Sequence, residues 1–137
     1  MYDPLLDAAY RRTHYQVLAP AGALLLRIDA PCPEMVVVHR QCSVSCSTVI
    51  SAWNPRSLAQ TAEQNAAAHE KLCLRMVACQ LTHWPSWGRD MSGAWPAEKG
   101  LFVLGLALAA ARQLGAEFGQ NALVHLAADC VPRLVWI

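Results

Sequence analysis

The chain has 137 residues, of which 55% are hydrophobic, and this content is enough to form the core of one folded domain. Its 11 basic and 10 acidic side chains leave a formal net charge of +1 at pH 7, and the arginines are scattered rather than gathered on one stripe. The composition therefore argues against intrinsic disorder and gives no support to nucleic-acid binding through a basic face.

The amino-terminal part predicts a short helix and then a β-hairpin. Residues 3–12 offer an apolar face to a helix, and residues 13–18 and 23–28 flank a turn that contains Pro20 and Gly22. Arginines at positions 11 and 12 precede this apolar segment, as in a signal peptide, but the turn residues interrupt it. We therefore expect a hairpin rather than an export signal, and a cytoplasmic protein.

Residues 29–42 allow two interpretations. Pro33 and Glu34 suit the start of a helix, whereas the valines at positions 36–38 favour a strand. We favour a short helix that connects the hairpin to the next strand, which we place at residues 46–53.

The stretch from Thr48 to Asn65 predicts a strand, a turn and a helix in succession. The β-branched residues at positions 48–50 suit a buried strand. Asn54 precedes Pro55, so the chain must turn there. Two capping boxes follow, and we favour the one at Thr61 as the start of a helix that continues to about residue 81. Its inward face is expected to hold the small and apolar side chains Ala62, Ala66, Cys73 and Met76.

Residues 82–100 contain three tryptophans, two prolines and three glycines and show almost no periodicity, so we predict a long loop. Two alternatives remain open for it. The tryptophans either cover the core as an ordered flap, or they form a wall over the Asn54 turn.

The remaining residues predict a strand, a helix and two further strands. Residues 101–106 form an apolar run typical of a central strand, and residues 107–118 follow as a helix that Gly119 ends. Strands are expected at 122–126 and 133–137. Residues 1–137 thus predict a single compact α+β domain with a mixed β-sheet of about five or six strands and two principal helices packed on it.

Three classes of function receive no support. The longest apolar run, residues 101–111, is shorter than the ~20 residues that a membrane span needs, so we expect no membrane partner. The six cysteines are expected to be free thiols in a reducing compartment, and His39, Cys42 and Cys46 lack the paired spacing of a structural zinc site. A glycine-rich phosphate loop is also absent, so we expect neither a metal nor a cofactor.

Polar side chains gather at two junctions between elements, the Asn54 turn and Gln120-Asn121. If the tryptophan-rich segment folds over the turn, Arg56 and Arg89 could hold an anion while neutral amides orient it. The carboxyl ends of strands in open α/β sheets are common ligand sites, and the turn is expected at such an edge. An enzymatic activity is left open, because Ser57 lies in no recognisable nucleophile motif.

Several blocks resemble a bacterial domain of unknown function, number 3293. The resemblance rests on TVISAWNPRS with TAEQN, on GAWPAEKGLFVLG and on LGAEFGQNALV, with YRRTHY as weaker support. It implies functional positions at Trp53, Asn54, Pro55, Ser57, Asn65, Trp95, Glu98, Gln120 and Asn121. The sequence departs from the family pattern near Gly100, where a small hydroxyl residue would be expected.

We therefore expect a small polar or anionic ligand to bind between the Asn54 turn, the Trp95 segment and the Gln120 junction. The candidate ligand-binding residues are Trp53, Asn54, Arg56, Ser57, Asn65, Arg89, Trp95, Glu98, Gln120 and Asn121. The alternative is a non-catalytic protein-interaction module that uses exposed tryptophans, such as Trp84 and Trp87, as anchors.

Overall fold

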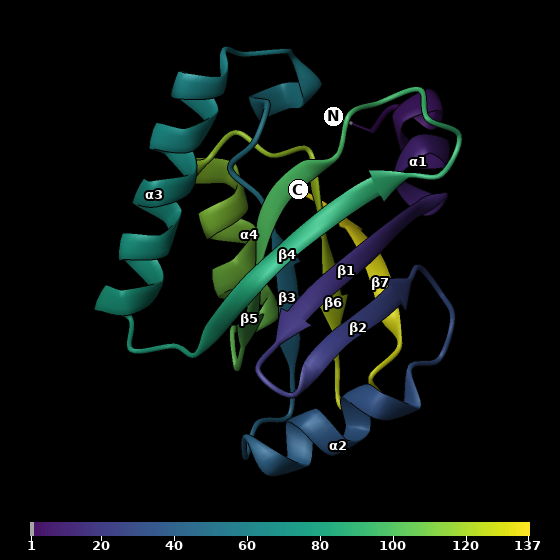
Figure 1. The fold of residues 1–137 in the computed structure, drawn as a ribbon, viewed down its shortest axis with the longest axis vertical. Helices are drawn as coiled ribbons and strands as arrows, with labels where there is room; N and C mark the ends of the chain where they lie inside the picture. The colour runs from purple at the N-terminus through teal and green to yellow at the C-terminus, as the bar shows by residue number, and fades with distance from the viewer. Residues whose placement is uncertain (1) are drawn as a thin grey trace.

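The computed structural model describes residues 2–137, which form four α-helices and one seven-stranded sheet (Figure 1). The helices are α1 (Pro4–Arg11), α2 (Pro33–Gln41), α3 (Ala62–Ala78) and α4 (Leu108–Glu117), with a 3-10 turn, η1 (Pro55–Ser57). The strands are β1 (Thr13–Ala19), β2 (Gly22–Arg27), β3 (Ser47–Ile50), β4 (His83–Asp90), β5 (Glu98–Leu104), β6 (Ala122–Leu126) and β7 (Pro132–Trp136). Their order is β2-β1-β4-β5-β3-β6-β7, and every adjacent pair is antiparallel.

This architecture confirms an α+β domain and corrects its details. The sheet is antiparallel rather than mixed, and within the described residues it has seven strands rather than five or six. Two shorter helices, α1 and α2, accompany the two principal ones. The additional strand is β4, which occupies the first half of the segment that we predicted as a long loop; only residues 91–97 connect it to β5.

The sequence pattern did not predict β4 as a strand because this segment contains a proline and a glycine, Pro85 and Gly88. Pro85 has no N–H to donate, and proline is normally confined to strand positions without a ladder partner on that side. The pairing of β4 with β1 extends only to Val17 opposite Ser86, so Pro85 has β5 as its one neighbouring strand. A residue that usually argues against a central strand is therefore tolerated here.

The sheet curls until its two edge strands, β2 and β7, approach each other (Figure 1). The backbone N–H of Asp29, just after β2, donates to the carbonyl oxygen of Pro132 at 2.7 Å. Helix α2 lies across one end of the curled sheet and α1 lies near the other (Figure 1). The indole N–H of Trp136 in β7 donates to the carboxylate of Asp7 in α1 at 2.9 Å, which fixes α1 to the sheet.

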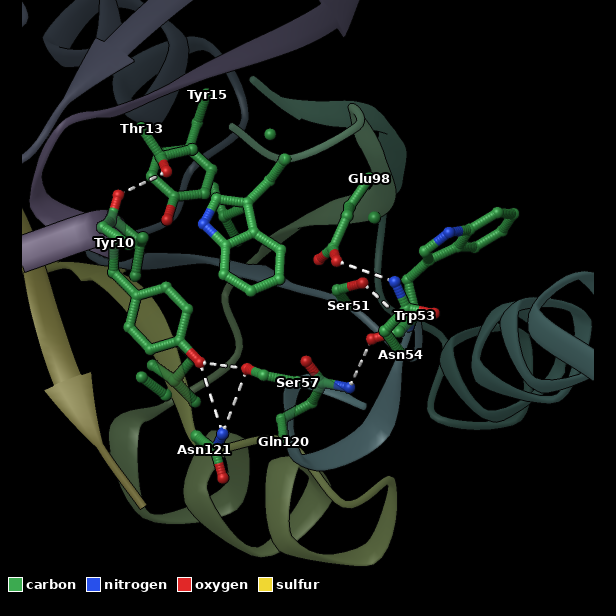
Figure 2. A pocket seen from close by; sticks show the side chains of 18 of the residues that line it. Tyr10, Thr13, Tyr15, Ser51, Trp53, Asn54, Ser57, Glu98, Gln120 and Asn121 are labelled. Carbon is green, nitrogen blue, oxygen red and sulfur yellow. Dashed lines mark hydrogen bonds between the residues drawn. The ribbon is translucent and has the colours of Figure 1, made fainter. Parts of the chain in front are cut away.

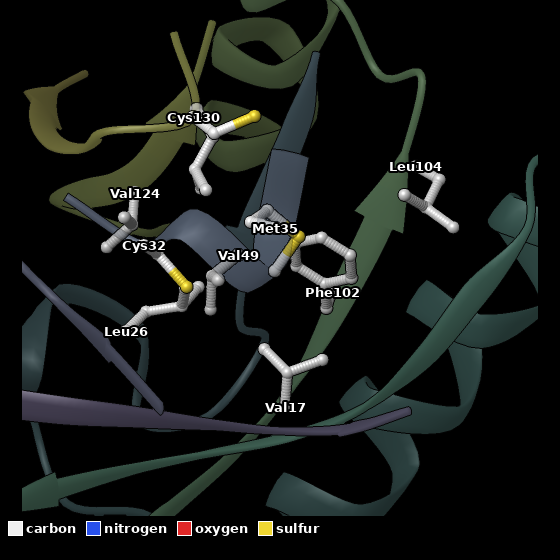
Figure 3. Close-up of a cluster of buried hydrophobic side chains, with 10 residues drawn as sticks. Val17, Leu26, Cys32, Met35, Val49, Phe102, Leu104, Val124 and Cys130 are labelled. Atoms are coloured by element: carbon white, nitrogen blue, oxygen red, sulfur yellow. The ribbon is translucent and has the colours of Figure 1, made fainter. Parts of the chain in front are cut away.

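Alternation along the strands produces a separate apolar core on each face of the sheet. On the concave face, Val17, Phe102 and Leu104 pack with Met35 of α2 (Figure 3). On the other face the buried side chains come from β3, β5, β6, α3 and α4; they include Ile50, Leu101, Val103, Leu72, Met76, Ala111 and Leu114. Among residues 2–137, no helix has both the length and the apolar character needed to cross a bilayer.

Candidate functional site

A cavity of about 300 Å³ continues the concave core toward the end of the sheet where α1 lies. Along three adjacent strands, the large apolar side chains of the core give way on the same face to polar residues and glycine. These are Thr13 and Tyr15 on β1, Ser86, Gly88 and Asp90 on β4, and Glu98 and Gly100 on β5. Because Glu98 is one of the residues that line it, we call this space the Glu98 cavity.

Two glycines hollow the floor of the Glu98 cavity. Gly88 stands in register between Tyr15 and Glu98, so no side chain separates the phenol from the carboxylate. At Gly100 a Cβ atom would lie 2.8 Å from the carbonyl oxygen of Ile50, which leaves no room for a side chain. The hydroxyl of Ser86 lies beside this position, 3.0 Å from where that Cβ would be.

The wall opposite β1 is the turn after β3, which holds an unusual backbone. Asn54, Arg56 and Ser57 all have positive φ, at 43°, 57° and 58°, a region that costs non-glycine residues about 1–2 kcal/mol each. Asn65 of α3 supports the turn, because its side-chain oxygen accepts from the Asn54 backbone N–H at 2.9 Å. Its amide nitrogen donates back to the Asn54 side-chain oxygen at 2.8 Å. Hydrogen bonds from Asn65 of α3 therefore stabilise the strained backbone of the turn.

Asn54 also fixes the orientation of Glu98. Its amide nitrogen donates to one carboxylate oxygen of Glu98 at 3.1 Å (Figure 2). Burial raises the pKa of Glu98, and the hydrogen bond from Asn54 offsets this only in part. Lys99 stands between Glu98 and Gly100 on β5 and does not line the cavity, so strand alternation places its side chain on the other face of the sheet. Its ammonium group is therefore directed away from the carboxylate.

A second polar cluster joins α1, the turn and the α4–β6 junction. The hydroxyl groups of Tyr10 and Ser57 are 2.7 Å apart. The amide nitrogen of Asn121 donates to Tyr10 at 3.3 Å and to Ser57 at 3.2 Å (Figure 2). We call these three residues the hydroxyl cluster. Residues that are 111 positions apart thus share one hydrogen-bond network.

Gln120 is oriented by the backbone of the turn. Its amide nitrogen donates to the carbonyl oxygen of Trp53 at 3.2 Å. This leaves the amide oxygen free to face the labelled side chains of the cavity (Figure 2). Gln120 therefore contributes a hydrogen-bond acceptor to the cavity that the hydroxyl cluster also lines.

The structure brings most of the expected site residues together. Those that line the cavity are Trp53, Asn54, Ser57, Trp95, Glu98, Gln120 and Asn121. Asn65 lies behind the turn and supports it. Arg56 and Arg89 do not line the cavity. Arg56 is exposed on the turn, and the guanidinium carbon of Arg89 lies 5.9 Å from the centroid of the Trp87 ring. The expected arginine pair around an anion is therefore not formed.

Sequence patterns contained little indication of the cavity residues on β1, β4 and α1. Tyr10, Thr13 and Tyr15 line the cavity, and the YRRTHY block was their one indication. Ser86 could not be found from the sequence, because its strand was predicted as a loop. Ser51, whose hydroxyl donates to the Lys99 carbonyl at 2.8 Å, joins the turn to β5.

Among the described residues, the charged side chains that line the cavity are both acidic. Asp90 is neutralised locally: Arg12 donates to it at 3.2 Å, and both the backbone and the hydroxyl of Ser92 donate to it as well. Glu98 forms no ion pair with any residue in 2–137, and its side-chain hydrogen bond comes from the neutral amide of Asn54. No group of three or more potential metal-binding side chains occurs within residues 2–137.

A sequence profile of the family described as "Protein of unknown function (DUF3293)" matches residues 50–123. This segment is more than half of the chain, and it contains the Asn54 turn, Glu98 and the Gln120 junction. No curated protein and no solved structure matches the chain significantly. The chain therefore belongs to the family of proteins of unknown function DUF3293.

Proposed function

We propose that this domain binds a small polar molecule in the Glu98 cavity. The observation that carries the proposal is that a partly buried carboxylate, that of Glu98, and a hydroxyl cluster line the same space of about 300 Å³. Ligand sites in proteins typically have roughly this size or more, with mainly apolar walls and a few fixed polar groups. Leu6, Ala9 and Leu134 supply apolar wall in this case.

The charges favour a neutral or cationic ligand over an anionic one. Arginine side chains do not line the cavity in the described part of the chain, whereas Glu98 does. An anion would meet the carboxylate without a compensating positive group, which is costly in a partly desolvated site. The proposal therefore keeps the expected polar ligand and drops the expected anion.

The alternative of a protein-interaction module receives less support. Trp84 stacks on the buried Phe102 with ring centroids 5.8 Å apart, and both Trp84 and Trp87 are only partly exposed. Trp95 is 47% exposed, but it also lines the cavity. A partly exposed tryptophan at the rim suits a ligand site at least as well as a protein contact.

The setting that we propose is the cytoplasm. All six cysteines are free in the structure, which supports a reducing compartment.

A thermal-shift screen of polar metabolites against the wild-type chain and the Ser57→Ala variant tests the proposal. A ligand of the cavity should raise the wild-type melting temperature and lose most of this effect in Ser57→Ala. Ser45→Ala is the matched control, because Ser45 is exposed in a loop and does not line the cavity. Ligands that stabilise all three chains equally would place the binding site elsewhere.

A further inference from the structure

The two ends of the polar lining of the Glu98 cavity differ in what they offer a ligand. At one end, the Glu98 carboxylate has one oxygen fixed by Asn54, and its other oxygen has no hydrogen-bond partner among residues 2–137. Arg12 is engaged with Asp90, and Lys99, between Glu98 and Gly100 on β5, lies on the opposite face. This end therefore offers an acceptor with an uncompensated negative charge.

The hydroxyl cluster offers a donor instead. Its members contribute four polar hydrogens: two on the Asn121 amide nitrogen and one on each hydroxyl group. The cluster contains three internal hydrogen bonds, two from Asn121 and one between Tyr10 and Ser57. One hydroxyl hydrogen therefore has no partner inside the cluster and is available to a bound acceptor.

A third group has no protein partner. The hydroxyl of Ser86 lines the cavity, is 1% exposed as a residue, and makes no hydrogen bond to any described residue. Buried hydroxyls are normally satisfied, because an unpaired one costs about 1–3 kcal/mol. Its position beside Gly100, on the floor of the cavity, suits a polar atom of a ligand that reaches this depth.

We infer that the ligand carries a positively charged donor, such as a protonated amine, against Glu98, and an acceptor, such as a carbonyl oxygen, against the hydroxyl of Ser57 or Tyr10. This inference rests on the proposed function, because it assumes that the cavity is the binding site. It identifies the ligand class as amino compounds with a neutral carbonyl or hydroxyl group at some distance from the amine.

The test uses three matched series of straight-chain probes, each with two to five methylene groups: ω-amino amides, alkyl amides without the amine, and ω-carboxy amides. Binding is followed by chemical-shift changes in proton–nitrogen spectra of the full chain, which also verify that each variant is folded. We expect at least one amino amide to shift cavity resonances and to bind roughly 10-fold or more tightly than its amine-free counterpart, as a charge-assisted hydrogen bond would give. The carboxy amides should bind weakest.

Variants separate the two contacts. Glu98→Gln keeps an acceptor for Asn54 and should reduce amino-amide affinity to the level of the plain amide, with plain-amide binding unchanged. Ser57→Ala should weaken both series by roughly 3- to 10-fold. Glu70→Gln, which removes an exposed carboxylate on α3, is the matched control and should change nothing.

The outcomes distinguish the inference from the proposed function. If plain or carboxy amides bind in the cavity as tightly as amino amides, the inferred ligand class is wrong while the binding site stands. If amino amides bind equally to wild type and Glu98→Gln, the contact with Glu98 is likewise wrong. If none of the probes, nor any metabolite in the screen, shifts a cavity resonance, the proposed function itself fails.

Discussion

The side-chain amide of Asn54 donates to the Glu98 carboxylate at 3.1 Å and so joins the turn after β3 to the first residue of β5. The same side chain accepts from the Gln60 backbone N–H at 3.1 Å and from the Asn65 amide at 2.8 Å. One residue with positive φ thus holds the floor of the cavity, the turn and the start of α3 in a fixed arrangement.

Asn54→Ala should therefore destabilise the protein by about 2–4 kcal/mol, through the loss of three hydrogen bonds and the strain of alanine at positive φ. Asn54→Gly removes the same hydrogen bonds, but glycine adopts positive φ without strain. This variant should therefore destabilise the protein by about 1 kcal/mol less than alanine does. Urea denaturation of the three chains measures both effects. Equal stabilities of the alanine and glycine variants would show that the positive φ of 43° is not a source of strain.

The hydroxyl cluster predicts energetic coupling between α1 and the turn. Tyr10→Phe and Ser57→Ala should each cost about 0.5–1.5 kcal/mol, and the double variant should cost less than their sum by a similar amount. A double-mutant cycle in urea measures this coupling. Tyr2→Phe is the control, because Tyr2 contacts the Trp136 ring and no hydrogen bond joins it to Ser57. Strict additivity for the Tyr10 pair would mean that the 2.7 Å contact contributes nothing.

Gly100 and Gly88 lie in adjacent strands but should respond differently to alanine. At Gly100 the new Cβ would meet the Ile50 carbonyl oxygen at 2.8 Å, and the backbone would have to move, which costs about 1–3 kcal/mol. At Gly88 the nearest atom is a ring carbon of Tyr15 at 3.4 Å, an ordinary contact. Thermal unfolding should place Gly100→Ala well below wild type and Gly88→Ala near it, and the reverse order would contradict the tight floor described above.

Glu98 should make the folded state less stable as the pH rises. Burial raises its pKa above the ordinary value of 4.5, so between the two values the folded state binds more protons than the unfolded state. The contribution of Glu98 to the free energy of unfolding is fully present below pH 4.5 and is lost as the pH rises through the folded-state pKa of this carboxyl group. Glu98→Gln removes this dependence, so its stability relative to wild type should increase from pH 4.5 toward neutrality. Urea titrations across this range test the sign, and a constant difference would contradict it.

Three histidines whose pKa is lowered by burial or partial burial should act in the opposite direction. His39 contacts Ser47 at 2.7 Å and Cys130 at 3.2 Å, and burial lowers its pKa below 6.5. Burial also lowers the pKa of His69 and of His125. The unfolded state then binds more protons below pH 6.5, so stability should fall as the pH decreases from that value. His39→Gln should reduce the slope of unfolding free energy against pH, and an unchanged slope would mean that His39 does not titrate on unfolding.

Local chemistry was enough to predict most of the secondary structure. The capping box of Thr61 with Gln64 starts α3 as expected, and both hydrogen bonds of the box are present. Gly119 ends α4 with φ of 70°. The hairpin and the two final strands also agree closely with the expected ranges. These features depend on residues close together in the chain, so they can be predicted from the sequence.

The buried face of α3 shows where such patterns fail. We expected Ala62, Ala66, Cys73 and Met76 to point inward, but the buried residues are Asn65, His69, Leu72 and Met76. The helix is rotated so that Asn65 reaches the Asn54 turn. A helical pattern of small residues does not reveal this rotation, because it depends on a partner eleven positions away.

The sequence by itself determined the elements other than β4, the α+β class and the polar turn at Asn54, since capping, turn chemistry and apolar runs are properties of neighbouring residues. The tertiary structure alone decided that β4 is a strand, that the sheet curls, and that Tyr10 meets Ser57 and Asn121. It also decided the charge of the site, by turning Arg56 and Arg89 outward and Glu98 inward. These outcomes depend on strand register and on which face each residue occupies, and residues far apart in the chain fix both.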